Sequence, residues 1–247
     1  MNLEQFFKEN PKVALGFSGG VDSTYLLYAA LRHGADVKAY YVQSVFQPAF
    51  ELKEARRLAA EIGAKITVLS LDALADPRVV ANPAERCYYC KLGIFGALSA
   101  RAKADGYAVL MDGTNASDDA SDRPGMKALE ELGVYSPLRM CGLTKEMIRA
   151  YSKDAGLATW NKPAYACLAT RIPSGRPITA DLLRRVEASE AALFALGFSD
   201  FRVRVYEDAA RLQMPLAAEA LVLQKKTEIL AALKPHFPII LLDLEGR

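Results

Sequence analysis

The first seventy residues alternate between short apolar runs and amphipathic stretches. The predicted order is strand, helix, strand, helix and strand, over residues 13–17, 23–32, 37–42, 50–62 and 65–71. This alternation is typical of a parallel sheet covered by helices, because parallel neighbours need a crossover connection. In the helix predicted over 50–62, apolar residues recur at steps of three and four, so one face packs on the sheet. We therefore predict an α/β fold built on a parallel sheet.

The pattern changes towards the carboxyl end. A strand is predicted over 108–111 and a helix from Thr144 to Asp154. The irregular stretch 160–177 is predicted to be a domain junction, because long loops inside compact domains are uncommon. Beyond it we predict a helix, two paired strands, a helix and a strand, over 180–196, 201–206, 210–214, 216–233 and 239–242. The expected domains are therefore a parallel-sheet domain over 1–165 and a smaller α/β domain over 175–247.

Turn-forming residues support these boundaries. Gly34, Gly63 and Gly106 each follow a helical pattern, where glycine can adopt the left-handed conformation that ends a helix. The segment 116–125 is rich in Ser, Asp, Pro and Gly. We expect it to be a mobile loop at the carboxyl edge of the sheet.

Composition restricts the classes of partner. Thirty-one basic residues nearly balance twenty-nine acidic ones, and the net charge of +2 gives no support for a broad grip on nucleic acid. No apolar run reaches the length of a membrane helix, and the polar amino-terminal segment lacks a signal-peptide core. We therefore expect a cytoplasmic protein without a membrane or nucleic-acid partner.

The segment Ser-Gly-Gly-Val-Asp-Ser at 18–23 lies directly between a predicted strand and a predicted helix. Two glycines let the backbone turn tightly and direct its N–H groups at an anion, and the helix presents further N–H groups and its positive end. The segment lacks the Gly-Lys-Ser/Thr ending of the Walker loop and the three-glycine dinucleotide spacing. It predicts a phosphate-binding loop. The alternative is a Ser/Asp helix cap on a glycine turn.

Four cysteines occur in the chain. Cys87 and Cys90 form a Cys-x-x-Cys pair, which indicates metal, cluster or redox chemistry in a reducing compartment, with a buried pair as the alternative. With the distant Cys167 they make a three-thiolate set, which leaves one iron of a cluster open, whereas structural zinc needs a fourth ligand. Cys141 is the available fourth ligand, but we interpret it as a buried cysteine that begins a helix.

Cys167 is a candidate reactive residue in its own right. Arg171 follows it by four residues and Lys162 precedes it by five. A neighbouring cation lowers the pKa of a thiol towards the thiolate. The alternative is a small buried side chain.

The loop at 18–23 resembles the PP-loop of ATP pyrophosphatases, which cleave ATP between the α and β phosphates. The resemblance implies adenylation chemistry. It implies that the loop residues bind ATP, namely Ser18, Gly19, Gly20, Val21, Asp22 and Ser23. Asp22 is the candidate partner of Mg²⁺, directly or through water.

Three passages together resemble the LarE family of ATP-dependent sulfur transferases. They are Gly-Phe-Ser-Gly-Gly-Val-Asp-Ser at 16–23, Arg-Cys-Tyr-Tyr-Cys-Lys at 86–91, and Lys-Pro-Ala-Tyr-Ala-Cys-Leu-Ala-Thr-Arg-Ile-Pro-Ser-Gly at 162–175. Shorter likenesses run through nearly the whole chain, at 112–115, 123–125, 136–138, 142–145 and 202–205. The combination is much more specific than the phosphate loop alone.

This resemblance implies a role in making the nickel-pincer nucleotide of lactate racemase. Family members adenylate a carboxylate of a pyridinium dicarboxylate mononucleotide, release pyrophosphate and form a thiocarboxylate. Some members sacrifice the sulfur of one cysteine, and Cys167 matches that position. Others carry three cysteines and hold a 4Fe-4S cluster, which favours a cluster on Cys87, Cys90 and Cys167 here. The resemblance also implies a homo-oligomer.

Three arginines are candidate ligands of the acidic substrate. Arg202 and Arg204 alternate along one strand face, and with Arg171 they can grip phosphate or carboxylate through forked hydrogen bonds. The alternative is a solvated basic face. The resemblance favours substrate binding by Arg202 and Arg204 in the smaller domain. Ser44 and Gly113 follow strand ends and are expected at the nucleoside side of the ATP pocket.

Three other functions remain open from the sequence. A tRNA thiolase of the PP-loop class would need a basic RNA platform. An amidating enzyme similar to NAD or GMP synthetase would leave the cysteines idle. A nucleotide-binding sensor would bind ATP without cleaving it.

Overall fold

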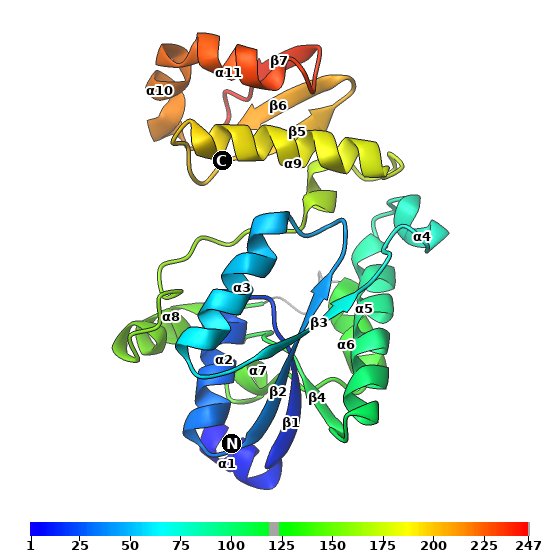
Figure 1. Cartoon of the computed structure of the whole chain (residues 1–247), viewed down its shortest axis with the longest axis vertical. Coiled ribbons are helices and arrows are strands. Elements are labelled where there is room, and N and C mark those ends of the chain that lie inside the picture. The colour runs from blue at the N-terminus through cyan, green and yellow to red at the C-terminus, as the bar shows by residue number, and fades with distance from the viewer. Residues whose placement is uncertain (119–123, 247) are drawn as a thin grey trace. The chain divides into compact units, whose positions relative to one another are not determined.

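The computed structural model describes residues 1–118 and 124–246, and the chain divides into two compact units (Figure 1). Unit 1 comprises Met1–Ala73 and Glu85–Ala164, and unit 2 comprises Leu74–Ala84 and Tyr165–Arg247. In the described part of the chain, no helix combines the length and apolar character that a membrane span requires.

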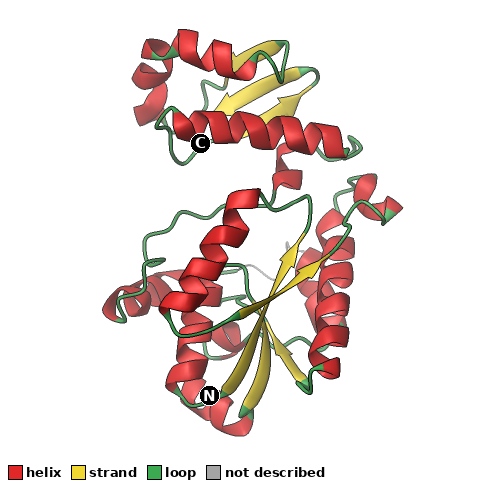
Figure 2. Cartoon of the chain, viewed as in Figure 1, coloured by secondary structure: helices red, strands yellow, loops and turns green. Residues whose placement is uncertain are grey.

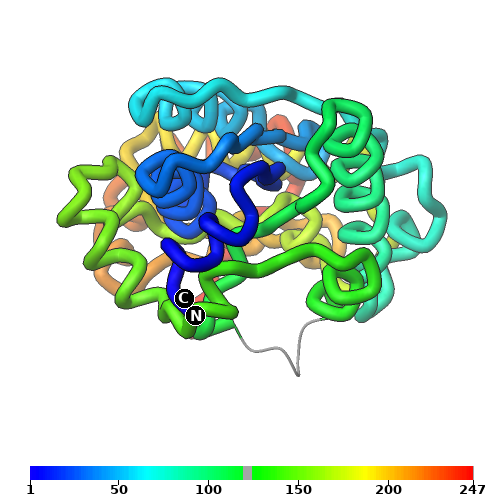
Figure 3. The backbone as a smooth tube through the Cα atoms, turned by 90° about the horizontal axis from the view of Figure 1, so that it is seen from below, coloured from blue at the N-terminus to red at the C-terminus, as the bar shows by residue number. Residues whose placement is uncertain are grey.

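Unit 1 contains a parallel sheet with helices on both faces (Figure 2). Its elements are α1 (Leu3–Glu9), β1 (Lys12–Gly16), α2 (Val21–Arg32), β2 (Asp36–Gln43), α3 (Ala49–Glu61), β3 (Ile66–Ser70), α5 (Arg86–Ala104), β4 (Val109–Met111), α6 (Pro124–Glu131), α7 (Pro137–Met140) and α8 (Lys145–Asp154). Helices α2, α3 and α8 cover one face, and α5 and α6 cover the other (Figure 1). Seen from below, α1 lies beside α2 and α7 (Figure 3). The predicted α/β class with a parallel sheet is confirmed.

The strand order β3-β2-β1-β4 determines where a ligand can bind. The chain proceeds from β1 to β2 and β3 on one side, and then returns to place β4 on the other side of β1. The direction in which strands are added therefore reverses at β1, and open α/β sheets bind ligands at the carboxyl ends of the strands at such a switch point. The segment 18–23 leaves β1 at this point, and the segment 112–115 leaves β4 beside it.

Unit 2 is a small α/β unit. Its elements are α4 (Pro77–Val80), the 3-10 turn η1 (Leu168–Arg171), α9 (Ala180–Ala195), β5 (Arg202–Tyr206), β6 (Ala209–Gln213), the 3-10 turn η2 (Leu216–Ala218), α10 (Glu219–Gln224), α11 (Lys226–Leu233) and β7 (Ile239–Leu242). Strand β6 pairs antiparallel with β5 and parallel with β7. Helix α9 packs on β5 and on α11. The expected small carboxyl-terminal α/β part is therefore present.

The division into units differs from the expected boundaries of 1–165 and 175–247. Residues 74–84 belong to unit 2, because Asn82 ties them to the segment after η1. The Asn82 amide donates to the carbonyls of Pro173 at 2.7 Å and Arg176 at 3.0 Å, and its own carbonyl accepts from Gly175 N at 2.8 Å. Of the predicted junction at 160–177, residues 160–164 belong to unit 1 and residues 165–177 belong to unit 2.

Three other expectations need correction. The helix predicted over 216–233 is broken at Lys225, whose backbone leaves helical geometry and whose ammonium donates to Leu196 O at 2.7 Å. The expected mobile loop at 116–125 falls partly outside the described residues, and Pro124 and Gly125 begin α6. Helices α1 and α6 were not predicted, and α5 was indicated only by the helical pattern before Gly106, with no start assigned. The left-handed conformation of Gly34, Gly63 and Gly106 is confirmed.

A buried ion pair organises unit 2. The side chains of Arg171 and Glu190 are 0% and 2% exposed, and Arg171 Nε donates to Glu190 Oε1 at 2.8 Å. Glu190 Oε1 also accepts from Val203 N at 2.9 Å, and its Oε2 accepts from Arg171 Nη2 at 3.1 Å and from the Tyr165 hydroxyl. One carboxylate thus joins η1, α9 and β5.

Replacing Glu190 by alanine should therefore destabilise the protein strongly. The change leaves the Arg171 guanidinium buried without its counter-ion, which costs about 3–5 kcal/mol. Arg184→Ala on the same helix is the matched control, because it removes only the exposed Asp181–Arg184 pair, worth less than about 1 kcal/mol. Denaturant unfolding of the full chain measures both. Equal small losses in the two variants would contradict the organising role of Glu190.

Candidate functional site

The phosphate loop at 18–23 is closed by its own hydroxyls. Ser23 Oγ accepts from Ser18 N at 3.3 Å and hydrogen-bonds Ser18 Oγ at 3.1 Å, while Ser18 Oγ accepts from Gly20 N at 3.3 Å. Gly19 has φ +71°, and a Cβ there would lie 3.2 Å from the Cα of Ala55. Helix α2 begins after Gly20 with no side-chain cap. Its first N–H groups are therefore available to an anion.

Gly113 brings the β4 loop against the start of α2. A Cβ at Gly113 would lie 3.0 Å from Ser23 N, 3.3 Å from Ser23 Cα and 3.4 Å from the Cβ of Asp22. Only glycine permits this approach without a shift of the loop. Gly113 was predicted to line the nucleoside side of the ATP pocket because it follows the end of a strand. Its observed place, against the backbone of the phosphate loop, supports a role in holding that loop in position.

Asp22 lies between two polar partners from other segments. Asn115 Nδ2 donates to Asp22 Oδ1 at 3.3 Å, and the Lys145 ammonium forms an ion pair with Oδ2. Asn115 is buried, and its Oδ1 accepts from Ser117 N at 2.8 Å, which orients the amide. Mg²⁺ in nucleotide sites is held by one or two carboxylates together with phosphate oxygens. Asp22 fits that role, since its carboxylate already faces a cation.

A second lysine borders the loop. Lys162 Nζ donates to Gly19 O at 3.0 Å and to Glu54 Oε2 at 2.7 Å. Neither Lys145 nor Lys162 was predicted as a phosphate-site residue, and Asn115 was also missed. All three residues lie in passages that resemble the LarE family, at 112–115, 142–145 and 162–175, and this position was the available indication of a role.

Ser44 lies at the carboxyl end of β2, as expected. Its backbone N and its hydroxyl both donate to Gln47 Oε1, at 3.0 and 2.7 Å, and Ser44 Oγ accepts from Phe46 N at 3.2 Å. These bonds close a turn at residues 44–47. Ser44 therefore shapes the end of β2, and its contact with a nucleoside stays a prediction.

Cys87 and Cys90 lie on the first turns of α5 and share one face of it, because they are three residues apart. Cys87 is exposed and accepts from Arg86 Nη2 at 3.8 Å. Cys141 ends α7 instead of beginning a helix, and burial raises the pKa of its thiol. Cys141 is partly buried, where a buried residue was predicted, and its raised pKa disfavours the thiolate. Its structural role stays a prediction.

Cys167 immediately precedes η1, and its carbonyl is held by two residues of that turn. Thr170 Oγ1 donates to Cys167 O at 2.8 Å, and Arg171 Nη1 donates to the same oxygen at 3.3 Å and to Ala166 O at 2.8 Å. Arg171 was predicted as a catalytic residue. Because it is buried and bonded to Glu190 and to these carbonyls, we interpret it as a positioning residue for the Cys167 segment.

The three-cysteine cluster stays a prediction. Cys87 and Cys90 belong to unit 1, and Cys167 belongs to unit 2. Among residues 1–118 and 124–246, no group of three or more His, Cys, Asp or Glu side chains is arranged to hold a metal ion.

The predicted arginines share one face of the unit 2 sheet. Arg204 lies directly opposite Arg211 on β6, and Arg202 lies two residues earlier on β5. Like charges directly opposite each other destabilise a sheet. Burial lowers the pKa of both Arg202 and Arg204, with the charge of Arg171 as the next cause. Each guanidinium has a partner within unit 2: Arg204 donates to Gln213 Oε1 and, at 2.7 Å, to Thr170 O, Arg202 Nη1 donates to Phe201 O at 2.6 Å, and Arg211 lies 3.5 Å from Asp243 Oδ2. Arg211 is the member of this group that was not predicted, and binding of an anionic ligand by Arg202 and Arg204 stays a prediction.

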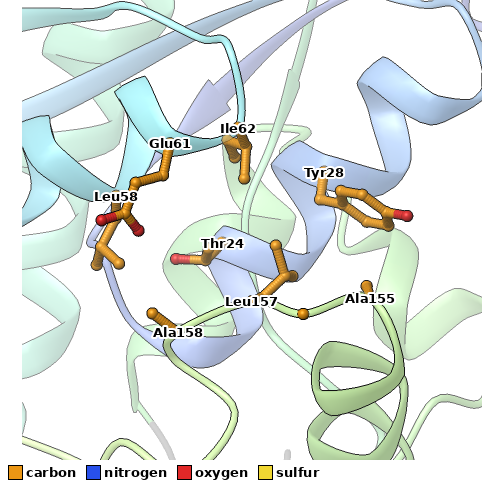
Figure 4. A pocket seen from close by; sticks show the side chains of 9 residues that line it. Thr24, Tyr28, Leu58, Glu61, Ile62, Ala155, Leu157 and Ala158 are labelled. Atoms are coloured by element: carbon orange, nitrogen blue, oxygen red, sulfur yellow. The ribbon is translucent and has the colours of Figure 1, made fainter.

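One cavity of about 300 Å³ lies beside α2 in unit 1 (Figure 4). It is lined mainly by apolar side chains, with the carboxylate of Glu61 and the hydroxyl of Thr24 among them. The Thr24 hydroxyl is buried without a hydrogen-bond partner and points into the cavity. The cavity is lined by none of the predicted site residues.

Replacing Gly113 by alanine should weaken pyrophosphate binding by about 10-fold while the protein stays folded. The added Cβ pushes against Ser23 N and displaces the first N–H groups of α2. Gly96→Ala is the control, because a Cβ there meets no atom within 4 Å. Calorimetric titration with pyrophosphate measures the effect. Unchanged affinity in a folded Gly113→Ala variant would contradict it.

The sequence was compared with known proteins. The family model described as queuosine biosynthesis protein QueC matches residues 12–81, which contain the phosphate loop. An uncharacterised Synechocystis protein, slr1717, is 37% identical over 215 residues, 87% of this chain and 80% of that protein. The pyridinium-3,5-bisthiocarboxylic acid mononucleotide synthase of Lactiplantibacillus plantarum is 36% identical over 212 residues, 85% of this chain and 77% of the synthase.

The tRNA-specific 2-thiouridylase MnmA of Thermotoga maritima is more distant, at 25% identity over 189 residues, 59% of this chain and 52% of that enzyme. The synthase therefore matches more of the chain at higher identity, and the match includes most of its own length. The predicted family resemblance is confirmed. This chain belongs to the LarE family, the family of the pyridinium-3,5-bisthiocarboxylic acid mononucleotide synthase.

Proposed function

We propose that this protein is an ATP-dependent sulfur transferase that converts a carboxylate of a pyridinium dicarboxylate mononucleotide into a thiocarboxylate. The observation that carries the proposal is the uncapped start of α2 at the switch point of the sheet, with Asp22 facing a cation. The kinship with the bisthiocarboxylic acid mononucleotide synthase supports the choice of substrate.

The first half-reaction is adenylation. A substrate carboxylate oxygen attacks the α phosphorus of ATP, and the bond from that phosphorus to the oxygen bridging to the β phosphate breaks. The products are an acyl adenylate and pyrophosphate. The backbone N–H groups of Gly19, Gly20 and Val21 are suited to the leaving pyrophosphate, because they lie at the positive end of α2. Asp22 would hold Mg²⁺, which neutralises charge on the phosphates.

The second half-reaction transfers sulfur. A hydrosulfide ion attacks the acyl carbon, AMP leaves with the bridging oxygen, and the resulting thioacid loses its proton to give a thiocarboxylate. Cys167 is the proposed sulfur-handling residue, and Arg171 and Thr170 hold its segment in place. Cys87, Cys90 and Cys167 would hold a 4Fe-4S cluster, which when bound supplies an iron with an open coordination position.

The substrate is the proposed ligand of the arginine face in unit 2. Arg202 and Arg204 present guanidinium groups whose planar forks match phosphate and carboxylate. A bound anion would offset the repulsion of Arg171 on both arginines and of Arg211 on Arg204. The family resemblance further supports a homo-oligomer acting in the cytoplasm on a small acidic nucleotide.

The direct test supplies protein, ATP, Mg²⁺ and pyridinium-3,5-dicarboxylate mononucleotide with a sulfide source under anaerobic conditions. Mass spectrometry should show sulfur in the product, together with AMP and pyrophosphate. ATP binding without cleavage would indicate the sensor instead. Thiolation of tRNA under the same conditions would indicate the tRNA thiolase.

Asp22→Ala should reduce pyrophosphate release by on the order of 100-fold while the protein stays folded. The change removes the proposed metal-holding carboxylate from a loop and leaves the core intact. Asp154→Ala, an exposed carboxylate at the end of α8, is the matched control. Near-normal release by a folded Asp22→Ala variant would overturn the assignment of Asp22.

Cys167→Ala should keep pyrophosphate release and lose thiocarboxylate formation, because ATP is handled in unit 1 and the cysteine acts only in sulfur transfer. Pyrophosphate assays and mass spectrometry of the product separate the two half-reactions. Undiminished sulfur incorporation would reject the role of Cys167.

The same variant series tests the cluster. Replacing Cys87, Cys90 or Cys167 should release iron and acid-labile sulfide from anaerobically reconstituted protein, whereas Cys141→Ala should retain both. Reconstituted protein that holds only zinc would leave single-cysteine sulfur donation as the mechanism.

A further inference from the structure

Lys145 is the cation that faces Asp22. Its ammonium contacts Asp22 Oδ2, although the two residues are 123 positions apart in the sequence. The side chains of Lys145 and Asp22 are 34% and 19% exposed. The pair therefore lies at the surface of the phosphate loop, where a ligand can reach it.

The helix that carries Lys145 does not explain its presence. Lys145 is the first residue of α8, where the positive end of the helix disfavours a cation. The helix start is already satisfied by Thr144, whose hydroxyl accepts from Met147 N at 3.3 Å, and by the acidic Glu146. The favourable partner of the Lys145 charge is the Asp22 carboxylate.

The backbone of Lys145 is anchored beside the β4 loop. Lys145 N donates to Ser117 Oγ at 2.9 Å, and Ala116 N donates to Leu143 O at 2.8 Å. The same loop carries Asn115, which holds the other oxygen of Asp22. The anchor keeps the lysine near the phosphate loop, while its flexible four-carbon side chain can turn between partners.

We propose that Lys145 exchanges partners when the nucleotide binds. In the empty loop its ammonium neutralises Asp22. A divalent cation that binds Asp22 displaces the ammonium, because Mg²⁺ needs the carboxylate oxygen at 2.0–2.1 Å and repels a second cation. The displaced ammonium then binds a phosphate oxygen of the nucleotide. This inference rests on the proposed function and adds Lys145 as a phosphate-binding residue.

The proposal predicts effects of opposite sign for Lys145→Met. Without nucleotide, the variant should bind a divalent cation about 10-fold more tightly, because no ammonium competes for Asp22. Without metal, it should bind pyrophosphate about 10-fold more weakly, because one phosphate partner is missing. If Lys145 had a purely structural role, its replacement would weaken the binding of both the divalent cation and pyrophosphate.

The experiment uses the full chain and two probes. Electron paramagnetic resonance titrates Mn²⁺ in the absence of nucleotide, and calorimetry titrates pyrophosphate in the presence of a chelator. Lys145→Arg keeps the charge and should resemble the unmodified protein. Lys153→Met is the matched control, since it removes an exposed lysine from the other end of α8. Thermal melting checks the fold, and Lys145→Gln replaces the methionine variant if that variant unfolds.

The outcomes separate this inference from the proposed function. Tighter Mn²⁺ binding with weaker pyrophosphate binding supports partner exchange. Unchanged affinities, losses of both, or no Mn²⁺ binding by the Lys145 variant would overturn it. A failure of the unmodified protein to bind pyrophosphate would instead refute the phosphate site on which the proposed function depends.

Discussion

The close approach of Gly113 to the backbone of Ser23 is the constraint on which the loop at 18–23 of unit 1 depends. A Cβ at Gly113 would lie 3.0 Å from Ser23 N, so the β4 loop can lie against the first turn of α2 only because no side chain intervenes. Buried Asp112 fixes the same loop by accepting from the Ser136 hydroxyl at 2.6 Å. Because the β4 loop lies so close to α2, its Asn115 reaches Asp22 Oδ1. Lys145 reaches the other oxygen of Asp22.

Unit 2 is organised by a different interaction of comparable importance. Glu190 accepts hydrogen bonds from Arg171, Val203 N and the Tyr165 hydroxyl, and so joins the Cys167 segment to the strand that carries Arg202 and Arg204. A charge in that buried position is tolerated because it is fully paired. The two halves of the proposed reaction thus depend on separate networks. One network positions Asp22 and the loop at 18–23, and the other positions the Cys167 segment and the strand that carries Arg202 and Arg204.

The sequence predicts those parts of the fold that depend on residues close together in the chain. Strands β1 and β2 and helices α2 and α3 were predicted within two residues, because apolar spacing and terminal glycines are local. Helix α5 was indicated only by the helical pattern before Gly106, and its bounds were not predicted, since Gly93 and Gly96 weaken the pattern and partly buried residues lie on several of its sides. The assignment of 74–84 to unit 2 depends on Asn82, whose partners lie about ninety residues away.

For the site, the sequence alone determined the family and supplied the predicted phosphate loop and the candidate cysteines, because these depend on residue types at short, fixed spacings. Only the tertiary structure decided that Asp22 faces Lys145, that Lys162 borders Gly19, and that Arg204 opposes Arg211. Such pairs join segments that are distant in sequence, and no local pattern encodes their distance. Only the tertiary structure also showed that Arg171 is a buried partner of Glu190. Its guanidinium is stable in the interior because a carboxylate and backbone carbonyls accept its hydrogen bonds.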